Sequence, residues 1–415
     1  MTTLLTGRTA APANPASLVP LLALASGVAV ADNYYLQPLL ALIGADLGVG
    51  VGAMGAVAAL ALLGYATGLL LVVPLGDVVD RRPLVTGILG LTTLSLATMA
   101  LAPSLLVLAV AAFGVGLTSV VAQVLVPYAA SLADDASRGK VVGTVVSGIL
   151  AGIIGARVLA GLLGGVVGWR LVYAGAAGLT AGLMLLLARR LPAETDRHRR
   201  NGRADVPYRE VLRRVARLAR DLPGLRLRAA YGFCGFAVFS AIWTTLAFHL
   251  REQYDLGGPA VAAVALLGLF GAVLTPRIGA FAGRGRDSLV TGGAYAVLLA
   301  GAGLLALGAT SLPVLLLAVV VCDLAVNSGH VANLGVVYRL APQARSSATT
   351  VYMTTVFLGG ATGSVLAAAA YAQRGFVGVA EVSAAFAATA LVLWLTRVTV
   401  AAPRALEESW PEATA

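Results

Sequence analysis

Twelve apolar runs of about 20 residues follow one another along the chain, and they constrain its fold more than any other feature. A run of about 20 apolar residues is long enough to cross the hydrocarbon core of a membrane as a helix. Charged residues, prolines and glycines separate the runs, which lie at 18–43, 52–75, 83–101, 104–130, 140–166, 171–188, 229–250, 259–281, 289–309, 313–338, 346–371 and 377–396. We therefore expect an all-α membrane protein with 12 transmembrane helices.

Composition supports this expectation. Of the 415 residues, 59% are hydrophobic and only 12% are charged, whereas soluble domains carry about 25% charged residues. The 49 glycines suit close helix packing in lipid. Both cysteines lie in apolar runs, so they do not indicate a disulfide framework.

The basic residues predict an orientation, because cytoplasmic loops of membrane proteins are enriched in Lys and Arg. With a cytoplasmic N-terminus, 25 of the 29 basic residues fall inside, only Arg170, Arg251 and Arg374 fall outside, and Arg157 lies within a span. We therefore expect both termini in the cytoplasm. Lys140 is the only lysine, and the chain is rich in Ala, Gly, Val and Leu, which is typical of a GC-rich bacterial genome. The expected location is therefore a bacterial inner membrane. The arginines are spread over successive loops, which argues against a nucleic-acid partner.

The runs divide six and six around an Arg-rich interval. Val211, Val215, Leu218 and Leu222 recur there at helical spacing, which predicts an amphipathic helix at the cytoplasmic membrane surface or a plain tether. The expected parts are a tail (1–17), a six-helix bundle (18–190), the Arg-rich loop (191–228), a second six-helix bundle (229–397) and a tail (398–415).

The two halves show a weak internal repeat. LVTG occurs at 84–87 and 289–292, an offset of 205, while Arg138 with Arg345 and Gly152 with Gly359 are offset by 207. Transporters commonly use a duplicated unit with the solute site between the repeats. We expect two six-helix bundles related by pseudo-two-fold symmetry.

Four short segments stand out: GDVVDRRPL at 76–84, NYYLQPLL at 33–40, GWR at 168–170 and RSSATTVYM at 345–353. The first is similar to the Gly-x-x-x-Asp-Arg signature of the major facilitator superfamily. The other three resemble the bacterial arabinose-efflux-permease-like and drug–proton antiporter-like group of that family. The resemblance implies secondary transport by alternating access. It also implies that Gly76, Asp80 and Arg81 form a cytoplasmic gate.

The fifth span resembles the family's antiporter motif in part. Gly143, Gly152 and Gly161 occupy glycine positions, for which the resemblance implies helix packing, but Arg157 replaces the proline. The fourth span also departs, because Val110 stands where the family often places an arginine. These departures weaken the inference of antiport and the transfer of a proton-coupling arginine.

Ionisable residues inside spans are functional candidates, because each costs about 2.5–3.5 kcal/mol at the centre of a helix. Asp32 and Arg157 lie about 21 and 24 Å from the inside surface at 1.5 Å per residue. We therefore expect them to form an ion pair, which either serves function or locks the bundle.

The tenth span places Asp323, Asn327 and His330 on one helical face, at i, i+4 and i+7. A face this polar cannot contact lipid, so we expect it to face the bundle interior or a wet cavity. Histidine titrates near neutrality, and Asp323 or His330 is expected to carry a coupling proton. A satisfied hydrogen-bond network between helices is the alternative.

Further polar and aromatic residues in the spans are expected to contact the solute, with helix packing as the alternative for each. They are Asn33, Tyr34, Gln37, Gln123, Trp243 and Asn327.

Taken together, these features predict a proton-coupled exporter of a small organic or amphipathic compound. An uptake symporter on the same fold remains an alternative, as does, with less support, a membrane-embedded sensor or enzyme. The sequence contains no ATP-binding Gly-x-x-x-x-Gly-Lys-Ser/Thr loop and no His-Glu-x-x-His motif. We expect no cofactor and no metal. The expected partners are the solute, protons and the bilayer, and the protein is expected to be a monomer.

Overall fold

The computed structural model describes residues 15–134, 137–191 and 207–400, and all regular secondary structure in these ranges is helical. Most of the two predicted tails, residues 1–14 and 401–415, lies outside the described residues, as does 192–206 of the Arg-rich loop. The first half contains α1 (Pro15–Tyr34), α2 (Leu36–Leu47), α3 (Val51–Leu71), η1 (Val73–Asp77), α4 (Arg81–Ala100), α5 (Leu105–Thr118), α6 (Val121–Leu132), α7 (Arg138–Val167) and α8 (Trp169–Arg190). The second half contains α10 (Tyr208–Asp221), α11 (Pro223–Tyr254), α12 (Gly258–Phe281), η2 (Ala282–Arg286), α13 (Asp287–Gly308), α14 (Leu312–Leu340) and α15 (Arg345–Val400).

These elements make 12 membrane-crossing segments. α1 with α2, α3 with η1, and α5 with α6 each form one span. α15 contains two spans, because the backbone of Gly375 turns at φ 60° in its middle. The all-α fold with 12 transmembrane helices is confirmed.

The breaks within spans have local causes. Pro38 has no backbone N–H, and its ring crowds the carbonyl of Tyr34, so the first span bends between α1 and α2. In the fourth span, the Thr118 and Ser119 hydroxyls donate to the carbonyls of Gly114 (2.8 Å) and Val115 (2.7 Å) immediately before the break. Such bonds from a hydroxyl back to the preceding turn bend helices.

The weak sequence repeat corresponds to equivalent helix contacts. A Cβ on Gly152 of α7 would lie 2.1 Å from the carbonyl oxygen of Gly27 in α1, so only glycine allows this crossing. Gly359 of α15 makes the same kind of contact with α11, where its Cβ would lie 2.2 Å from the carbonyl oxygen of Phe233. Arg138 and Arg345 both begin their helices. Each half therefore packs its first helix against its fifth in the same way.

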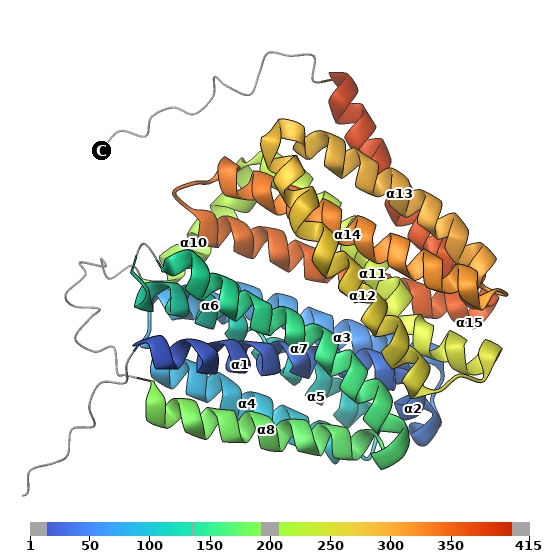
Figure 1. Ribbon diagram of the computed structural model, residues 1–415, viewed down its shortest axis with the longest axis horizontal. Coiled ribbons are helices and arrows are strands. Elements are labelled where there is room, and N and C mark those ends of the chain that lie inside the picture. The colour runs from blue at the N-terminus through green and yellow to red at the C-terminus, as the bar shows by residue number, and fades with distance from the viewer. Residues whose placement is uncertain (1–14, 135–136, 192–206, 401–415) are drawn as a thin grey trace, which may run out of the picture.

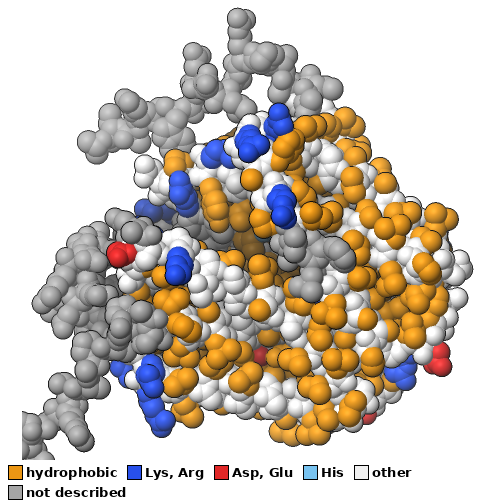
Figure 2. Space-filling model, in the orientation of Figure 1, with side chains coloured by type: hydrophobic (Ala, Val, Ile, Leu, Met, Phe, Trp, Pro, Cys, Tyr) orange, Lys and Arg blue, Asp and Glu red, His pale blue; other side chains and the backbone are white. Residues whose placement is uncertain are grey.

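The two groups of six helices lie side by side, as the lower and upper parts of Figure 1. They contact one another mainly through α3 with α15, α7 with α12, and α2 with α11. α4, α7, α11, α13 and α15 all begin on one side, which we call the Arg-rich side. Figure 2 shows Lys and Arg side chains gathered toward this side, at the left and top of the view.

The halves meet closely on the side opposite the Arg-rich side. There a Cβ on Gly258 of α12 would lie 2.1 Å from the carbonyl oxygen of Gly161 in α7, and a Cβ on Gly55 of α3 would lie 2.2 Å from the Ala368 Cβ of α15. Nearer the Arg-rich side Gly143 of α7 has open space around it, and Figure 2 shows a recess between the two halves. The molecule is therefore closed at one end and hollowed toward the other.

Apolar side chains, orange in Figure 2, are spread over both halves on the face shown there. Leu94, Leu106, Val110, Leu171 and Leu289 are each more than 60% exposed. Such a surface is stable in lipid, where apolar atoms are well solvated, and not in water.

The amphipathic helix expected in the central interval is α10. Its apolar residue Val215 is buried in a cluster with Leu225 of α11, Val337 of α14 and Tyr352 of α15. This stripe contacts protein, whereas the sequence predicted either the membrane surface or a plain tether. On its other edge, the Tyr208 hydroxyl donates to the carbonyl of Leu71 in α3 (2.7 Å), so α10 touches both halves.

Candidate functional site

Arg157 lies at the boundary between the two halves and is 5% exposed. Its Nη2 donates to Oε1 of Gln37 (3.1 Å), which lies on α2 of the same half. The guanidinium carbon also lies 4.0 Å from the ring centroid of Trp243, 5.0 Å from that of Tyr34 and 5.1 Å from that of Phe239. Trp243 and Phe239 belong to α11, so a cation of the first half rests against aromatic rings of the second.

Trp243 connects this cation to a carboxylate. Its indole Nε1 donates to Oδ1 of Asp323 on α14 (3.2 Å). Arg157 and Asp323 form no direct ion pair, but their charges attract one another across the indole. Gln37, Arg157, Trp243 and Asp323 therefore form a continuous polar and aromatic chain from α2 to α14, which we call the inter-half chain.

The expected pair between Asp32 and Arg157 is wrong. Asp32 is 1% exposed, and its Oδ2 accepts a hydrogen bond from the Thr180 hydroxyl of α8 (3.1 Å), within the first half. At 100° per residue, Asp32 is turned about 140° from Gly27, the α1 residue that faces α7. Equal depth in the membrane is therefore not enough, because the two side chains leave their helices in different directions.

A small cavity lies beside the inter-half chain. It is lined by Asn33, Tyr34, Gln37, Ala58 and Phe236, among others. The Asn33 side chain is buried, and its Oδ1 has no hydrogen-bond partner in the part of the chain that the structure describes. The cavity thus offers amide groups on an otherwise apolar and aromatic wall. Three predicted solute residues, Asn33, Tyr34 and Gln37, meet here.

The polar face of α14 is present, but its three side chains diverge. Asp323 points to α11, while the Tyr352 hydroxyl of α15 lies 3.2 Å from Nδ1 of His330. The Asn327 amide donates to the carbonyl of Asp323 one turn earlier (2.8 Å), and Asn327 is itself exposed beside α12. The structure therefore brings Asp323 and Trp243 together, and it places His330 in a separate contact between α14 and α15.

Gln123 lies away from the inter-half chain. It is half-buried on α6, and its side chain interacts with Tyr65 of α3. Its neighbourhood is the first half's inner surface, nearer the Arg-rich side than Arg157.

The predicted gate residues lie at the Arg-rich side of the first half. Asp80 caps α4, because its Oδ1 accepts from the backbone N–H of Arg82 (3.1 Å). Arg81 is buried, donates to the Ser131 hydroxyl of α6 (3.3 Å) and lies over the ring of Tyr128. Gly76 of η1 faces Val124, which also belongs to α6. These contacts fasten α4 to α6.

The three glycines of the fifth span do not share one role. Gly152 contacts α1 and Gly161 contacts α12, which lie on opposite sides of α7 because nine residues correspond to about 180°. For Gly143 the packing prediction is wrong in this structure, since a Cβ there would meet nothing within 4 Å. Gly143 shares the face of Gly161, but at the end where the halves have separated.

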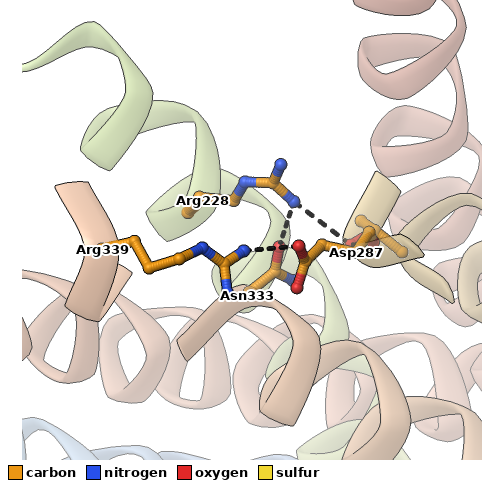
Figure 3. A network of polar contacts seen from close by, with 5 residues as sticks. Arg228, Asp287, Asn333 and Arg339 are labelled. Carbon is orange, nitrogen blue, oxygen red and sulfur yellow. Dashed lines mark hydrogen bonds and ion pairs between the residues drawn. The ribbon is translucent and has the colours of Figure 1, made fainter. Parts of the chain in front are cut away.

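Sequence reasoning missed a polar network at the Arg-rich side of the second half (Figure 3). Arg228 of α11 donates to the Asn333 amide oxygen of α14 (3.1 Å) and the Thr291 hydroxyl of α13 (3.2 Å). Arg339 of α14 forms an ion pair with Asp287, the first residue of α13. The LVTG repeat was the available signal, because it aligns Asp287 with Arg82 of the gate segment.

A second missed cluster surrounds His249, on the side opposite the Arg-rich side. Its ring stacks on Phe376 with centroids 4.3 Å apart and meets the edges of Tyr254 and Tyr371. The Tyr371 hydroxyl donates to the Glu252 carboxylate (2.7 Å). No repeat or family signature marked these residues.

Comparisons with known proteins agree with this architecture. The family model of the Major Facilitator Superfamily matches residues 22–363. The uncharacterized transporter YgaY of Escherichia coli O157:H7 is 38% identical over 380 residues, which cover 91% of this chain and 95% of that protein. The crystal structure of the nucleoside transporter NupG aligns with a TM-score of 0.70 at 15% identity, covering 93% of this chain and 100% of that one. That of the human organic anion transporter MFSD10 aligns with a TM-score of 0.67 at 17% identity, covering 92% and 99%.

The match to the family model spans most of the chain, and the similarity to YgaY extends over nearly the whole of both proteins. The 12-helix fold that the solved structures share with this chain is a fold of membrane transporters. The chain belongs to the major facilitator superfamily, and it is a multi-pass secondary transporter, not an enzyme.

Proposed function

We propose that this protein exports a small organic or amphipathic compound in exchange for protons, by alternating access. The inter-half chain carries the proposal. Arg157 of the first half, Trp243 and Asp323 of the second half form one connected unit at the boundary where the halves must move. A buried carboxyl group at such a boundary gives a proton direct influence over the contact between the halves.

In the proposed mechanism Asp323 carries the proton. When Asp323 is ionised, it attracts Arg157 across Trp243 and strengthens the contact between the halves. Protonation neutralises the carboxylate and removes this attraction, while the indole N–H keeps its acceptor. A proton therefore changes the relative stability of the two states of the carrier, which is the requirement for coupling.

The solute is proposed to bind beside this unit, against Asn33, Tyr34 and Gln37. In the present state the cavity there measures about 10 Å³, which is room for about one water, so the solute needs the halves to separate further around these residues. Gln37 already accepts a hydrogen bond from Arg157, so a solute that competes for the Gln37 amide also alters the surroundings of the cation. Amide groups against Ala58 and Phe236 suit a compound with one polar edge and an apolar body. Gln123 and Asn327 are proposed to contact it on its way to the Arg-rich side.

Two glycines on one face of α7 support alternating access. Gly161 touches α12 at the closed end, while Gly143, about 27 Å away at 1.5 Å per residue, faces open space. We infer that Gly143 contacts α12 when the Arg-rich side closes and the Gly161 contact opens. The gate residues Gly76, Asp80 and Arg81 are proposed to act in that same closed state.

We further propose that the Arg-rich side is cytoplasmic, with both termini there. The protein is proposed to be a monomer whose two halves are the six-helix bundles at 18–190 and 229–397. The distribution of arginines supports this orientation. The bacterial relatives suggest an inner membrane. The orientation is tested by fusing, after residue 400, a reporter enzyme that is active only in the cytoplasm. The fusion protein is expected to show reporter activity.

An uptake symporter is the second candidate. The observation that favours it is Arg157 itself, which stands where the antiporter motif of the fifth span has proline. Export is proposed first because the segments at 33–40 and 345–353 resemble the efflux group.

The test uses proteoliposomes with an imposed pH gradient and a panel of labelled organic compounds. Movement of a compound against the direction of proton flow supports export, and movement with the protons supports uptake. Asp323→Asn is expected to abolish gradient-driven movement but to retain solute exchange without a gradient. Asp32→Asn, which removes a buried carboxylate that contacts only the first half, is the matched control. Unchanged driven transport by Asp323→Asn would remove Asp323 from the coupling role.

A further inference from the structure

Two apolar pockets lie beneath α10, away from the inter-half chain. The first is lined mainly by α11 and α15, with Ala229, Phe233, Phe386 and Leu393 on its walls. The second lies between α10, the end of α3 and α15. Ala219, Val351 and Thr355 line both pockets, so the two are neighbours on either side of a shared ridge.

Both pockets lie at the depth of lipid acyl chains. Val351 and Thr355 are six and ten residues from the start of α15, and Ala229 and Phe233 are six and ten residues from the start of α11. At 1.5 Å per residue, the walls extend about 9–15 Å below the helix ends on the Arg-rich side. This is the outer part of the hydrocarbon layer, just beneath the lipid headgroups.

Arginines border the pockets at the headgroup level. Arg226 lines the first pocket directly, and its Nη1 donates to the carbonyl of Arg220 (2.9 Å). On α10, Arg209 and Arg213 project within about 60° of Ala216, which lines the second pocket. The site therefore combines apolar walls with cations at one end.

The acidic residues nearby neutralise only part of this positive charge. α10 carries five arginines and two acids. Asp221 pairs with Arg220, whose guanidinium lowers the pKa of that carboxyl group, and Glu210 contacts Arg217 and, at 3.8 Å, Arg213. Positive charge is left over where the pockets open.

We propose that an anionic phospholipid of the leaflet on the Arg-rich side binds here. Its acyl chains occupy the two pockets, and its phosphate group contacts Arg213 and Arg226. Phosphate pairs well with guanidinium groups, and basic residues at a membrane surface attract anionic lipids. The ridge of Val351 and Thr355 separates the two chains.

Such a lipid would contact both halves of the transporter. Leu70 and Leu71 of α3 line the second pocket opposite Val351 and Thr354 of α15, and Tyr208 bonds α10 to the carbonyl of Leu71. When α3 moves relative to α15, this pocket changes shape. The lipid therefore favours the state in which these walls are close together.

The test compares phosphatidylglycerol with phosphatidylcholine of identical acyl chains. Native mass spectrometry of the purified full-length protein gives the dissociation constant of each lipid, and a thermal unfolding scan gives the stabilisation. Phosphatidylglycerol is expected to bind more tightly and to raise the unfolding temperature more. Glycerophosphoglycerol, which lacks acyl chains, is expected not to bind.

Two sets of variants separate headgroup from chain contacts. Arg213→Gln with Arg226→Gln is expected to weaken phosphatidylglycerol binding about 25-fold, about fivefold for each arginine. Ala219 lines both pockets, so Ala219→Trp places a large side chain where the acyl chains are proposed to lie. It is expected to weaken binding of both lipids. Arg284→Gln with Arg286→Gln removes equal charge from exposed residues of η2, on the same side, and is the matched control.

The proposal is overturned if the two lipids bind equally well, or if the control pair loses as much affinity as the Arg213 and Arg226 pair. The proposal is also overturned if the Arg213 and Arg226 pair binds phosphatidylglycerol as tightly as the unmodified protein. All variants are first checked for a monodisperse elution profile. This site is independent of the transported solute and of Asp323.

Discussion

Gly161→Ala perturbs the contact that closes the end of the molecule opposite the Arg-rich side. An added Cβ at Gly161 would lie 2.6 Å from the carbonyl oxygen of Gly258 and 3.0 Å from both N and Cβ of Ala262. Backbone atoms form most of this obstacle, so α7 and α12 must separate by several tenths of an ångström. Overpacking of this kind costs about 1–3 kcal/mol.

That cost applies only in the state in which α7 and α12 touch. If the other state separates them, Gly161→Ala shifts the equilibrium between the two states about 5- to 150-fold toward it. The expected result is a molecule that opens at the side opposite the Arg-rich side. Gly165→Ala is the matched control, because a Cβ at Gly165, one turn along the same helix, meets nothing within 4 Å.

Pulsed electron paramagnetic resonance measures the shift. Spin labels are attached at Val166→Cys and Ala263→Cys, two exposed positions on α7 and α12, after both native cysteines are replaced by alanine. Gly161→Ala is expected to enlarge the long-distance population, and Gly165→Ala is expected to leave the distribution unchanged.

If the two glycine variants give the same distance distribution in correctly folded protein, the Gly161 contact does not control this opening. Gly143→Ala provides a test in the opposite direction. Its Cβ has space in the present state, so the proposed contact of Gly143 with α12 predicts a shift toward the short distances. A shift toward long distances would contradict that contact.

Three further experiments test the inter-half chain and the gate. In double-mutant cycles on the free energy of unfolding, Asp323→Asn and Arg157→Gln are expected to be coupled, whereas Asp32→Asn and Arg157→Gln should add within about 0.5 kcal/mol. Trp243→Phe keeps an aromatic ring but removes the N–H that donates to the Asp323 carboxylate. Chemical unfolding should therefore show a loss of about 1–3 kcal/mol in the free energy of unfolding. Asp80→Ala removes the N-cap of α4 and is expected to cost about 1 kcal/mol in the same measurement; no loss would show that the cap contributes nothing.

The fold was predictable because it depends on local properties of the chain. A run of apolar residues must be helical in lipid, since every backbone polar group has to be bonded within the segment. The 12 spans and their six-and-six division follow from this rule and from the interruptions. Even the weak offset between Gly152 and Gly359 corresponds to equivalent crossings in the two halves.

The candidate site was predictable only in part. Gln37, Arg157, Trp243 and Asp323 were selected because polar or charged side chains in spans need a reason to be there. Their partners were not predictable, since Arg157 was expected to contact Asp32 and instead contacts Gln37 and three aromatic rings. Phe239 carried no signal, because one more phenylalanine in an apolar span is ordinary.

The order of residues is enough to say which segments are buried in the membrane, how many there are and which polar residues lie among them. Which of these residues meet depends on how the helices pack. A side chain's depth follows from counting along one helix, but its neighbours depend on how each helix is rotated about its axis and where the next helix crosses. Crossings such as Gly27 with Gly152 fix those rotations through contacts between residues far apart in the chain.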